Sequence, residues 1–414
     1  MHRPRRGAPD LSTDAGASIR LVRDRLTWLL YLCLGVYGYW LYGFNPSIPL
    51  RGEELGLSRT VTGLHGTALA LGALLAGALL PVLARRVGRR VCLWAGLAGM
   101  CGGLLAYTAG TSVWVTLLAT LFAGTWGSLL VNTVTGSLGD HHGPAGPAAV
   151  SEANAMAAGL GLLSPLALGL ASAAGLGWRA GLLVTVVLAA GVAVTFRGTR
   201  VPSPARDDAS PVTPVRHQPG GPPAKPRAVM RAGRRLPRRY WVSWGALVLA
   251  IATEFTLAIW SSQLLAARGL GSAASTVSVT AIVGGMALGR AFGARLALRF
   301  SVDHLLTGCF GLTIVGFALF WSVEATAVSV TGLLIAGLGV SLQFPLIISR
   351  AIAAADGRTD LAVSRGGLGA GAAIGLGPFL LGAIADIVGI RTAFLLVPVM
   401  QLLAAMLIRG GGRH

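Results

Sequence analysis

Twelve apolar runs, each close to 20 residues long, constrain this chain more than any other feature of its sequence. A helix needs about 20 mainly apolar residues to cross a bilayer, and it satisfies its backbone hydrogen bonds internally. Only 12% of the residues are charged and the mean hydropathy is +0.69, whereas about a quarter of an ordinary soluble domain is charged. The sequence therefore predicts an all-α integral membrane protein with twelve transmembrane helices. Their approximate limits are 26–48, 60–84, 91–109, 112–138, 149–173, 178–197, 241–265, 274–298, 303–322, 326–350, 362–385 and 391–408.

Residues 198–240 form the one long stretch that is unsuited to an apolar medium. They are rich in proline and arginine and poor in large apolar side chains, so they cannot bury enough surface to offset the entropy of ordering. We expect a disordered, basic linker between two six-helix bundles, residues 26–197 and 241–408. Residues 1–25 and 409–414 are expected to be short tails.

Arginines in the short loops predict how the chain is oriented. They are concentrated in the two tails, in the loop at 85–90 and in the linker, and the side rich in arginine is normally cytoplasmic. Both termini are therefore expected in the cytoplasm of a cell with this protein in its plasma membrane. The arginines that end the linker are expected to attract anionic lipid.

The composition also argues against several other functions. The formal net charge of +19 does not indicate a nucleic-acid partner, because such proteins concentrate basic residues on a folded soluble face. The four cysteines lie inside apolar runs without metal-ligand spacing, and no phosphate-binding loop or nucleophile motif is present. We expect no metal, no cofactor and no enzymatic activity, and we expect a monomer.

The two halves of the sequence resemble each other at a fixed offset of 213 residues. Ser164-Pro165 and Gly377-Pro378 are related by this offset, and so are Ala123-Gly124 and Ala336-Gly337. Parallel repeats of this kind place two bundles around a pseudo-two-fold axis along the membrane normal, an arrangement used by secondary transporters.

The loop from Leu83 to Arg90 resembles the G-x-L-A-D-R-x-G-R-R signature of the major facilitator superfamily, with Pro81 in place of the glycine and Arg85 in place of the aspartate. This resemblance covers nearly the whole chain outside the amino-terminal tail and the linker. It implies the fold of that family, with two six-helix bundles. It also implies gating or interdomain roles for the residues of the loop, namely Arg86, Gly88, Arg89 and Arg90.

Ser164-Pro165, flanked by Gly159, Gly161 and Gly169, is similar to the fifth-helix motif of the family's proton antiporters. The alternative is that these small residues only allow close helix packing.

Glu254 is the main candidate for proton coupling. It lies about 13 residues into the seventh apolar run, and a carboxylate at the bilayer centre costs about 2.5–3.5 kcal/mol on insertion scales. The hypothesis is that burial lets Glu254 take up and release a proton as access alternates; the alternative is a permanently paired acid. Arg290 in the eighth run is either its partner or a structural arginine.

Glu152 and Arg365 are separated by the same offset of 213 and carry opposite charges, so they could form a cytoplasmic latch between the halves.

Polar and amphipathic side chains on the predicted helices are candidates for contact with a substrate. In the first run, Tyr37 and Trp40 share a helix face, and Asn45-Pro46 is expected to break the helix toward a central cavity. An interfacial aromatic belt and hydrogen bonds between helices are the alternative explanations. The full set of candidates is Tyr37, Trp40, Asn45, Trp126, Asn132, Trp260 and Gln343.

These observations favour a secondary active transporter that moves a small molecule by alternating access. Proton coupling is expected, and efflux is favoured slightly over uptake by the fifth-helix motif and the aromatic candidates. The alternative is a membrane sensor or enzyme that uses a transporter scaffold without transporting.

Overall fold

The computed structural model describes residues 21–202, 236–297, 299–356 and 358–410, and within these ranges it contains helices and no strands. The two predicted tails and the predicted linker lie largely outside the described residues, so the expectation of disorder stays a prediction. The helices are α1 (Arg25–Glu54), α2 (Arg59–Ala109), α3 (Val113–His142), η1 (Gly143–Ala145), α4 (Gly146–Ala173), α5 (Trp178–Phe196), α6 (Arg238–Ala267), α7 (Ser272–Ala297), α8 (Val302–Ser322), α9 (Thr326–Val340), α10 (Gln343–Ala353), α11 (Thr359–Val388), α12 (Ile390–Ala393) and α13 (Leu396–Gly410).

Most of these helices are suited to a bilayer. Among the described residues, 11 helical segments are long and apolar enough to cross a membrane, and α2 contributes two of them. The first helix, α1, is 30 residues long but is not one of the 11. Its tyrosines, tryptophans, glycines and prolines lower its hydropathy, yet it packs against α3, α4, α5 and α6. The prediction of an all-α membrane protein is confirmed.

Several predicted boundaries were wrong in informative ways. Asn45-Pro46 does not break the first helix, because α1 continues through Pro46 and Pro49 to Glu54 with most of its residues buried in tertiary contacts. Membrane helices tolerate proline where neighbouring helices support the chain. The fourth run does not end at 138, since α3 continues to His142 before the 3-10 turn at Gly143–Ala145. The second and third runs are confirmed as two spans, 59–80 and 82–109, which share the label α2 because only the non-helical Gly88 separates their helices.

The kink in α2 depends on glycine. Gly88 has φ of 82° and ψ of 159°, a backbone conformation that side chains with a Cβ rarely adopt. It reverses the chain between two membrane spans, at the centre of the arginine-rich loop that resembles the family signature.

The repeat predicted from the sequence appears as equivalent contacts in the two halves. Gly72 lies against the backbone of Leu121 and Thr125, and at the same offset of 213, Gly285 lies against the backbone of Leu334 and Leu338. In both places a Cβ would clash with the neighbouring helix, so each glycine allows two helices to touch.

A second pair of contacts follows the same offset. Gly103 packs on Ala123 in the first half, and Gly316 packs on Ala336 in the second. The prediction of two pseudo-symmetric bundles is therefore confirmed by helix packing as well as by sequence.

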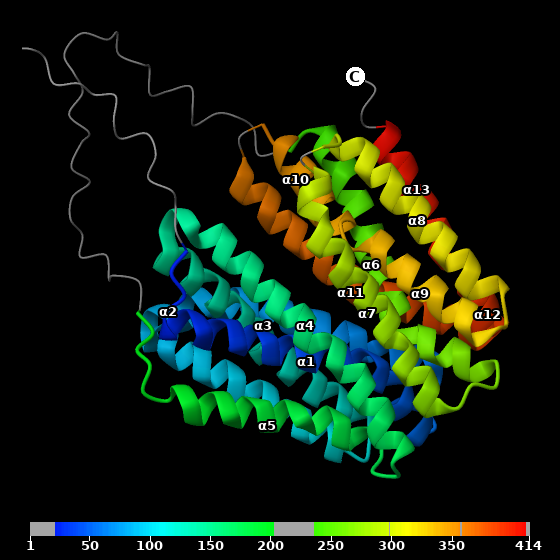
Figure 1. The fold of residues 1–414 in the computed structure, drawn as a ribbon, viewed down its shortest axis with the longest axis horizontal. Coiled ribbons are helices and arrows are strands. Elements are labelled where there is room, and N and C mark those ends of the chain that lie inside the picture. Colours follow the sequence, from blue (N-terminus) through cyan, green and yellow to red (C-terminus); the bar gives the residue numbers. More distant parts are fainter. Residues whose placement is uncertain (1–20, 203–235, 298, 357, 411–414) are drawn as a thin grey trace, which may run out of the picture.

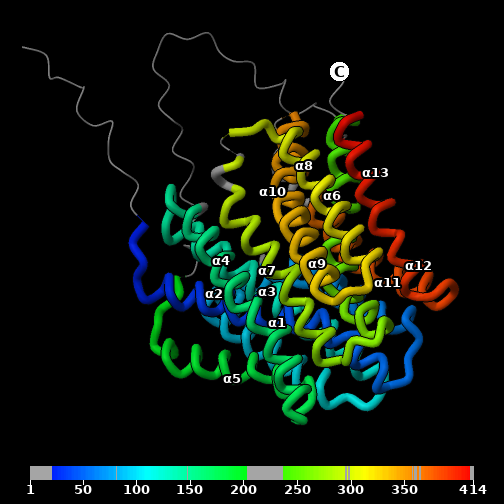
Figure 2. The backbone as a smooth tube through the Cα atoms, turned by 45° about the vertical axis from the view of Figure 1, so that its right-hand side comes forward, coloured from blue at the N-terminus to red at the C-terminus, as the bar shows by residue number. Residues whose placement is uncertain are grey.

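The two bundles meet at an angle (Figure 1). Helices α1 to α5 form one half and α6 to α13 the other, and in both views the halves diverge toward the side where α5 ends and α6 begins. We call this the linker side. The tube view in Figure 2 shows the halves joined on the opposite side, where α1 ends and α2 begins.

Glu54, the last residue of α1, connects that helix to the start of α5 by hydrogen bonds, on the side of the protein opposite the linker side. Its carboxylate accepts hydrogen bonds from Arg179 Nη1 and Nη2 at 2.8 and 2.7 Å and from Trp178 Nε1 at 2.8 Å. It also accepts one from Arg51 Nη1 at 2.9 Å, and the Arg51 side chain is only 3% exposed.

Replacing Glu54 with glutamine is expected to lower the thermal unfolding midpoint of the purified protein. Hydrogen bonds to charged groups contribute about 1.5–3 kcal/mol, and the low end applies because the Glu54 side chain is 35% exposed and partly screened. The matched control is Glu53→Gln, since Glu53 is an exposed neighbour whose side chain forms no ion pair among the described residues. Equal midpoints for the two variants would contradict this role of Glu54.

Candidate functional site

The buried acid predicted in the seventh apolar run lies beside an arginine. Glu254 Oε1 on α6 is 3.7 Å from Arg290 Nη2 on α7, and the two side chains are 17% and 40% exposed. Arg290 Nη1 donates a hydrogen bond of 3.4 Å to the hydroxyl oxygen of Tyr42 on α1. These three side chains therefore link both halves of the protein in one polar group, which we call the central triad.

The geometry of the central triad leaves the acid weakly held. The 3.7 Å separation is an ion-pair distance that is too long for a strong hydrogen bond, and no hydrogen bond reaches Glu254 within the described parts of the chain. Thr253 and Thr256 beside it are buried. A carboxylate with one loose partner in an apolar setting can change its protonation state more easily than one fixed by several donors.

Tyr42 was not among the site residues predicted from the sequence. A glycine on the facing helix gives its side chain room to reach Arg290. Its ring lies against Gly161 on α4, where a Cβ would collide with it. Gly161 belongs to the glycine-flanked Ser164-Pro165 segment. That segment therefore acts at least in part by making room for Tyr42.

The predicted aromatic face of α1 packs against α3 in the first half and does not form part of the central triad. Tyr37 and Trp40 do share a face, with ring centroids 5.6 Å apart, but both rings lie against Gly127 on α3. Trp40 is fully buried and stacks on Phe44 at 5.5 Å. This face belongs to the core of the first half, and it is Tyr42 that reaches the second half.

The other candidates of the first half are separate from the central triad. Asn45 is buried, and its Oδ1 has no hydrogen-bond partner. Trp126 packs on Gly99 and belongs to a small cluster with Cys92 and Leu129. Asn132 is exposed on α3. The structure brings none of these three side chains into contact with Glu254.

Trp260 and Gln343 are structural residues of the second half. Trp260 is fully buried and donates from Nε1 to the carbonyl of Pro378 at 2.9 Å. Gln343 is buried at the start of α10, where its Nε2 donates to Thr313 Oγ1 at 2.9 Å and to Gln401 Oε1 at 3.0 Å. Both side chains have hydrogen-bond partners within the second half, and neither contributes to the central triad.

The arginines of the loop at 85–90 hold their own half together. Arg89 Nη1 lies 2.6 Å from Asp140 Oδ2 at the end of α3, and Arg90 Nη2 donates to the carbonyl of Arg197 at 2.9 Å. Arg86 is exposed. The loop has arginine instead of aspartate at position 85. Asp140, near the end of α3, provides the negative charge that pairs with an arginine of this loop.

The predicted latch between Glu152 and Arg365 is not formed. Glu152 Oε1 and Oε2 accept hydrogen bonds from Arg23 Nη2 at 2.5 Å and Arg23 Nε at 2.8 Å, and Tyr31 adds a third at 3.0 Å. Arg365 is exposed on α11. The prediction was wrong for this conformation because the two halves are apart on the linker side, and Glu152 pairs with Arg23 of its own half.

An inter-half contact that the sequence analysis missed closes the opposite side. Asp386 near the end of α11 accepts hydrogen bonds from the backbone N–H of Arg59 at 2.9 Å and of Thr60 at 2.7 Å, and from Thr60 Oγ1 at 2.6 Å. Arg59 Nε donates to Gln263 Oε1 on α6 at 3.2 Å. Asp386 thus satisfies free N–H groups at the start of α2, where a carboxylate is also favoured by the helix dipole.

Close packing continues from this contact along α2 and α11. Gly63 lies against the backbone of Phe379, and Thr67 Oγ1 donates to the carbonyl of Gly375 at 2.9 Å. On the other side of the pseudo-two-fold axis, Gly169 on α4 lies against Ala273 and Val277 on α7. The halves therefore meet through two glycine-lined seams, and the hydrogen bonds to Asp386 reinforce the seam between α2 and α11 on the side away from the linker.

Across the described ranges, no group of three His, Cys, Asp or Glu residues is placed to hold a metal ion. The four cysteines are free and buried.

Comparison with known proteins identifies the architecture. The sequence profile of the Major Facilitator Superfamily matches residues 30–356. No curated protein matches the sequence significantly. Among solved structures, a mutant form of the nucleoside transporter NupG superposes with a TM-score of 0.70 at 12% identity, covering 94% of this chain and 99% of that one. A bacterial homologue of the human lysosomal transporter Spinster, in an inward-facing and occupied conformation, superposes with a TM-score of 0.64 at 16% identity, covering 95% and 98%.

Proposed function

The chain belongs to the Major Facilitator Superfamily, and from that premise we propose that it is a proton-coupled secondary transporter that moves a small molecule across the plasma membrane by alternating access. The observation that carries the proposal is the central triad of Glu254, Arg290 and Tyr42, which joins an acid inside the membrane to both halves of the protein. Charged residues within a membrane are costly and are commonly retained for function.

The proposed mechanism uses Glu254 as the proton carrier. When Glu254 is ionised, it pairs with Arg290; when it is protonated, Arg290 loses this partner, and its hydrogen bond to Tyr42 strengthens or is exchanged for one to a substrate. Because Tyr42 belongs to α1 and Arg290 to α7, this change alters a contact between the two halves. A proton that moves through 100 mV contributes about 2.3 kcal/mol, which corresponds to a gradient of roughly 50-fold.

The conformation supports a specific step of the cycle. We assign the linker side to the cytoplasm, because arginines are concentrated there. The protein is then in an inward-facing state, closed on the outside by Asp386 and the start of α2. The change to an outward-facing state would exchange one packed arrangement of the two halves for another and would not deform the halves continuously. Proton coupling sets the direction of transport, and export of the substrate in exchange for an incoming proton is favoured slightly over uptake.

The test begins with a ligand, because the substrate class must be found first. We expect a thermal-shift screen of the purified protein against nucleosides, organic acids, sugars and antibiotics to yield a stabilising compound. That compound, radiolabelled, should accumulate in proteoliposomes when a pH gradient is imposed, and a protonophore should abolish the accumulation. Accumulation that survives the protonophore would rule out proton coupling, and binding without any transport would favour a sensor.

A further inference from the structure

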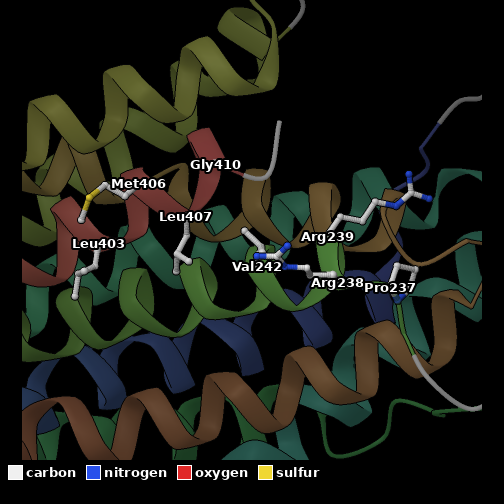
Figure 3. A pocket seen from close by; sticks show the side chains of 8 residues that line it. All are labelled: Pro237, Arg238, Arg239, Val242, Leu403, Met406, Leu407 and Gly410. Atoms are coloured by element: carbon white, nitrogen blue, oxygen red, sulfur yellow. The ribbon is translucent and has the colours of Figure 1, made fainter. Parts of the chain in front are cut away.

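A groove separate from the central triad lies between the first turn of α6 and the last turns of α13 (Figure 3). It has a volume of about 590 Å³. The residues that line it come from both helices: Pro237, Arg238, Arg239, Val242, Leu403, Met406, Leu407 and Gly410.

The shape of the groove follows from how these two helices pack. They approach closely at Gly245, where an added Cβ would lie 3.3 Å from Leu407 Cδ1. The groove lies beside this contact, between side chains of the first turns of α6 and the last turns of α13. Its α13 wall is apolar and accessible, since Leu403 is 43% and Met406 59% exposed. In a transmembrane helix such side chains face lipid.

The two arginines at the rim of the groove differ in whether an acidic residue neutralises their charge. Arg239 is engaged, because it forms an ion pair with Asp356 and donates to the carbonyl of Ala354 at 3.3 Å. Arg238 is exposed and has no acidic partner among the described residues. In Figure 3 the Arg238 side chain runs along α6 to Val242 at the edge of the groove, while that of Arg239 extends in the opposite direction, so the uncompensated charge at the groove is that of Arg238.

We propose that this groove binds one anionic phospholipid of the cytoplasmic leaflet. The headgroup phosphate contacts Arg238, and an acyl chain lies along Leu403, Met406 and Val242. Charge complementarity requires a negative headgroup, and the exposed apolar wall requires an attached alkyl chain, which a free phosphate ion lacks. An arginine close to the membrane surface attracts anionic lipid, and long side chains at helix ends reach the interface readily. The site does not depend on the proposed transport activity.

Native mass spectrometry of the full-length protein in mixed micelles tests this site. The probes are phosphatidylglycerol, phosphatidylcholine and inorganic phosphate. We expect the wild-type protein to retain phosphatidylglycerol in preference to phosphatidylcholine. Arg238→Gln should weaken phosphatidylglycerol binding about fivefold, the factor that corresponds to about 1 kcal/mol for one near-surface arginine. Met406→Gln should weaken it as well, by removing part of the apolar wall.

The matched control is Arg299→Gln, which removes another exposed arginine on the linker side, far along the chain from the groove. This variant should bind phosphatidylglycerol like the wild type. The proposal is overturned if Arg238→Gln binds phosphatidylglycerol like the wild type. It is also overturned if Arg238→Gln, Met406→Gln and the control Arg299→Gln all lose binding equally, or if inorganic phosphate displaces the lipid. Thermal unfolding midpoints without added lipid should be the same for all variants, which separates loss of the site from misfolding.

Discussion

Replacement of Glu254 by glutamine is expected to reduce proton-driven substrate accumulation at least tenfold while exchange of substrate across the membrane continues. Glutamine keeps the size of the side chain and its hydrogen-bonding capacity, but it cannot release a proton or pair with the Arg290 guanidinium 3.7 Å away. A variant of this kind should therefore bind and translocate substrate without coupling. The measurements are uptake driven by a pH gradient and substrate counterflow in the same proteoliposomes.

The control for Glu254 is Glu324→Gln. Glu324 Oε1 also pairs with an arginine, Arg391, at 3.6 Å, but its side chain is 77% exposed on the opposite side of the protein. Loss of pH-driven uptake in both variants would indicate a general effect of removing an ion pair. Full pH-driven uptake by Glu254→Gln would show that another group carries the proton.

The positions of Glu254 and Arg290 also stand out within the internal repeat. The residues 213 positions earlier are Leu41 and Gly77, so the first half has no counterpart of this ion pair. Packing contacts such as those of Gly72 and Gly285 are kept in both halves because each bundle needs them. Charge present in only one half has no such packing explanation, which is consistent with a role in transport.

Sequence reasoning found the helices and Glu254 because both depend on local composition. Apolar runs predict spanning helices directly, and an acid inside such a run is conspicuous. It did not select Tyr42 from the aromatic residues of α1, because a helix buried on nearly all sides has no single functional face. Which face meets α7 depends on how two bundles pack, and helix periodicity carries no information about that.

Asp386 was missed for a different reason. It lies one residue beyond the predicted end of the eleventh run at 385, where an acid is ordinarily a solvated residue of a helix end. Its role arises from α2, more than 300 positions earlier in the chain, whose first N–H groups it accepts. Pairings at such separation cannot be inferred from one sequence. The same limit explains Glu152, whose partner in this conformation is Arg23 instead of Arg365.

Replacement of Asp386 by asparagine is expected to shift the protein at least tenfold toward states in which the side opposite the linker is open. The carboxylate accepts three hydrogen bonds from Arg59 and Thr60, and bonds to a charged group contribute about 1.5–3 kcal/mol each. The pseudo-symmetric positions, Ala173 and Ala273, are apolar, so the seam between α4 and α7 has no equivalent polar contact to compensate. A change of about 1.4 kcal/mol in the balance of two states is a tenfold change in their ratio.

Distances between paired spin labels measure this shift, and the four native cysteines are buried, so that introduced cysteines can be labelled selectively. One label pair, at Glu53 and Ala325, reports on the opposite side; the other, at Arg85 and Ser349, reports on the linker side, and all four positions are exposed. In Asp386→Asn the first distance should lengthen and the second should shorten, because alternating access couples the two openings. The control is Asp303→Asn, since Asp303 pairs with Arg350 inside its own half. If both variants gave the wild-type distances, Asp386 would cap α2 without controlling access, and closure of the opposite side would depend on the glycine seams alone.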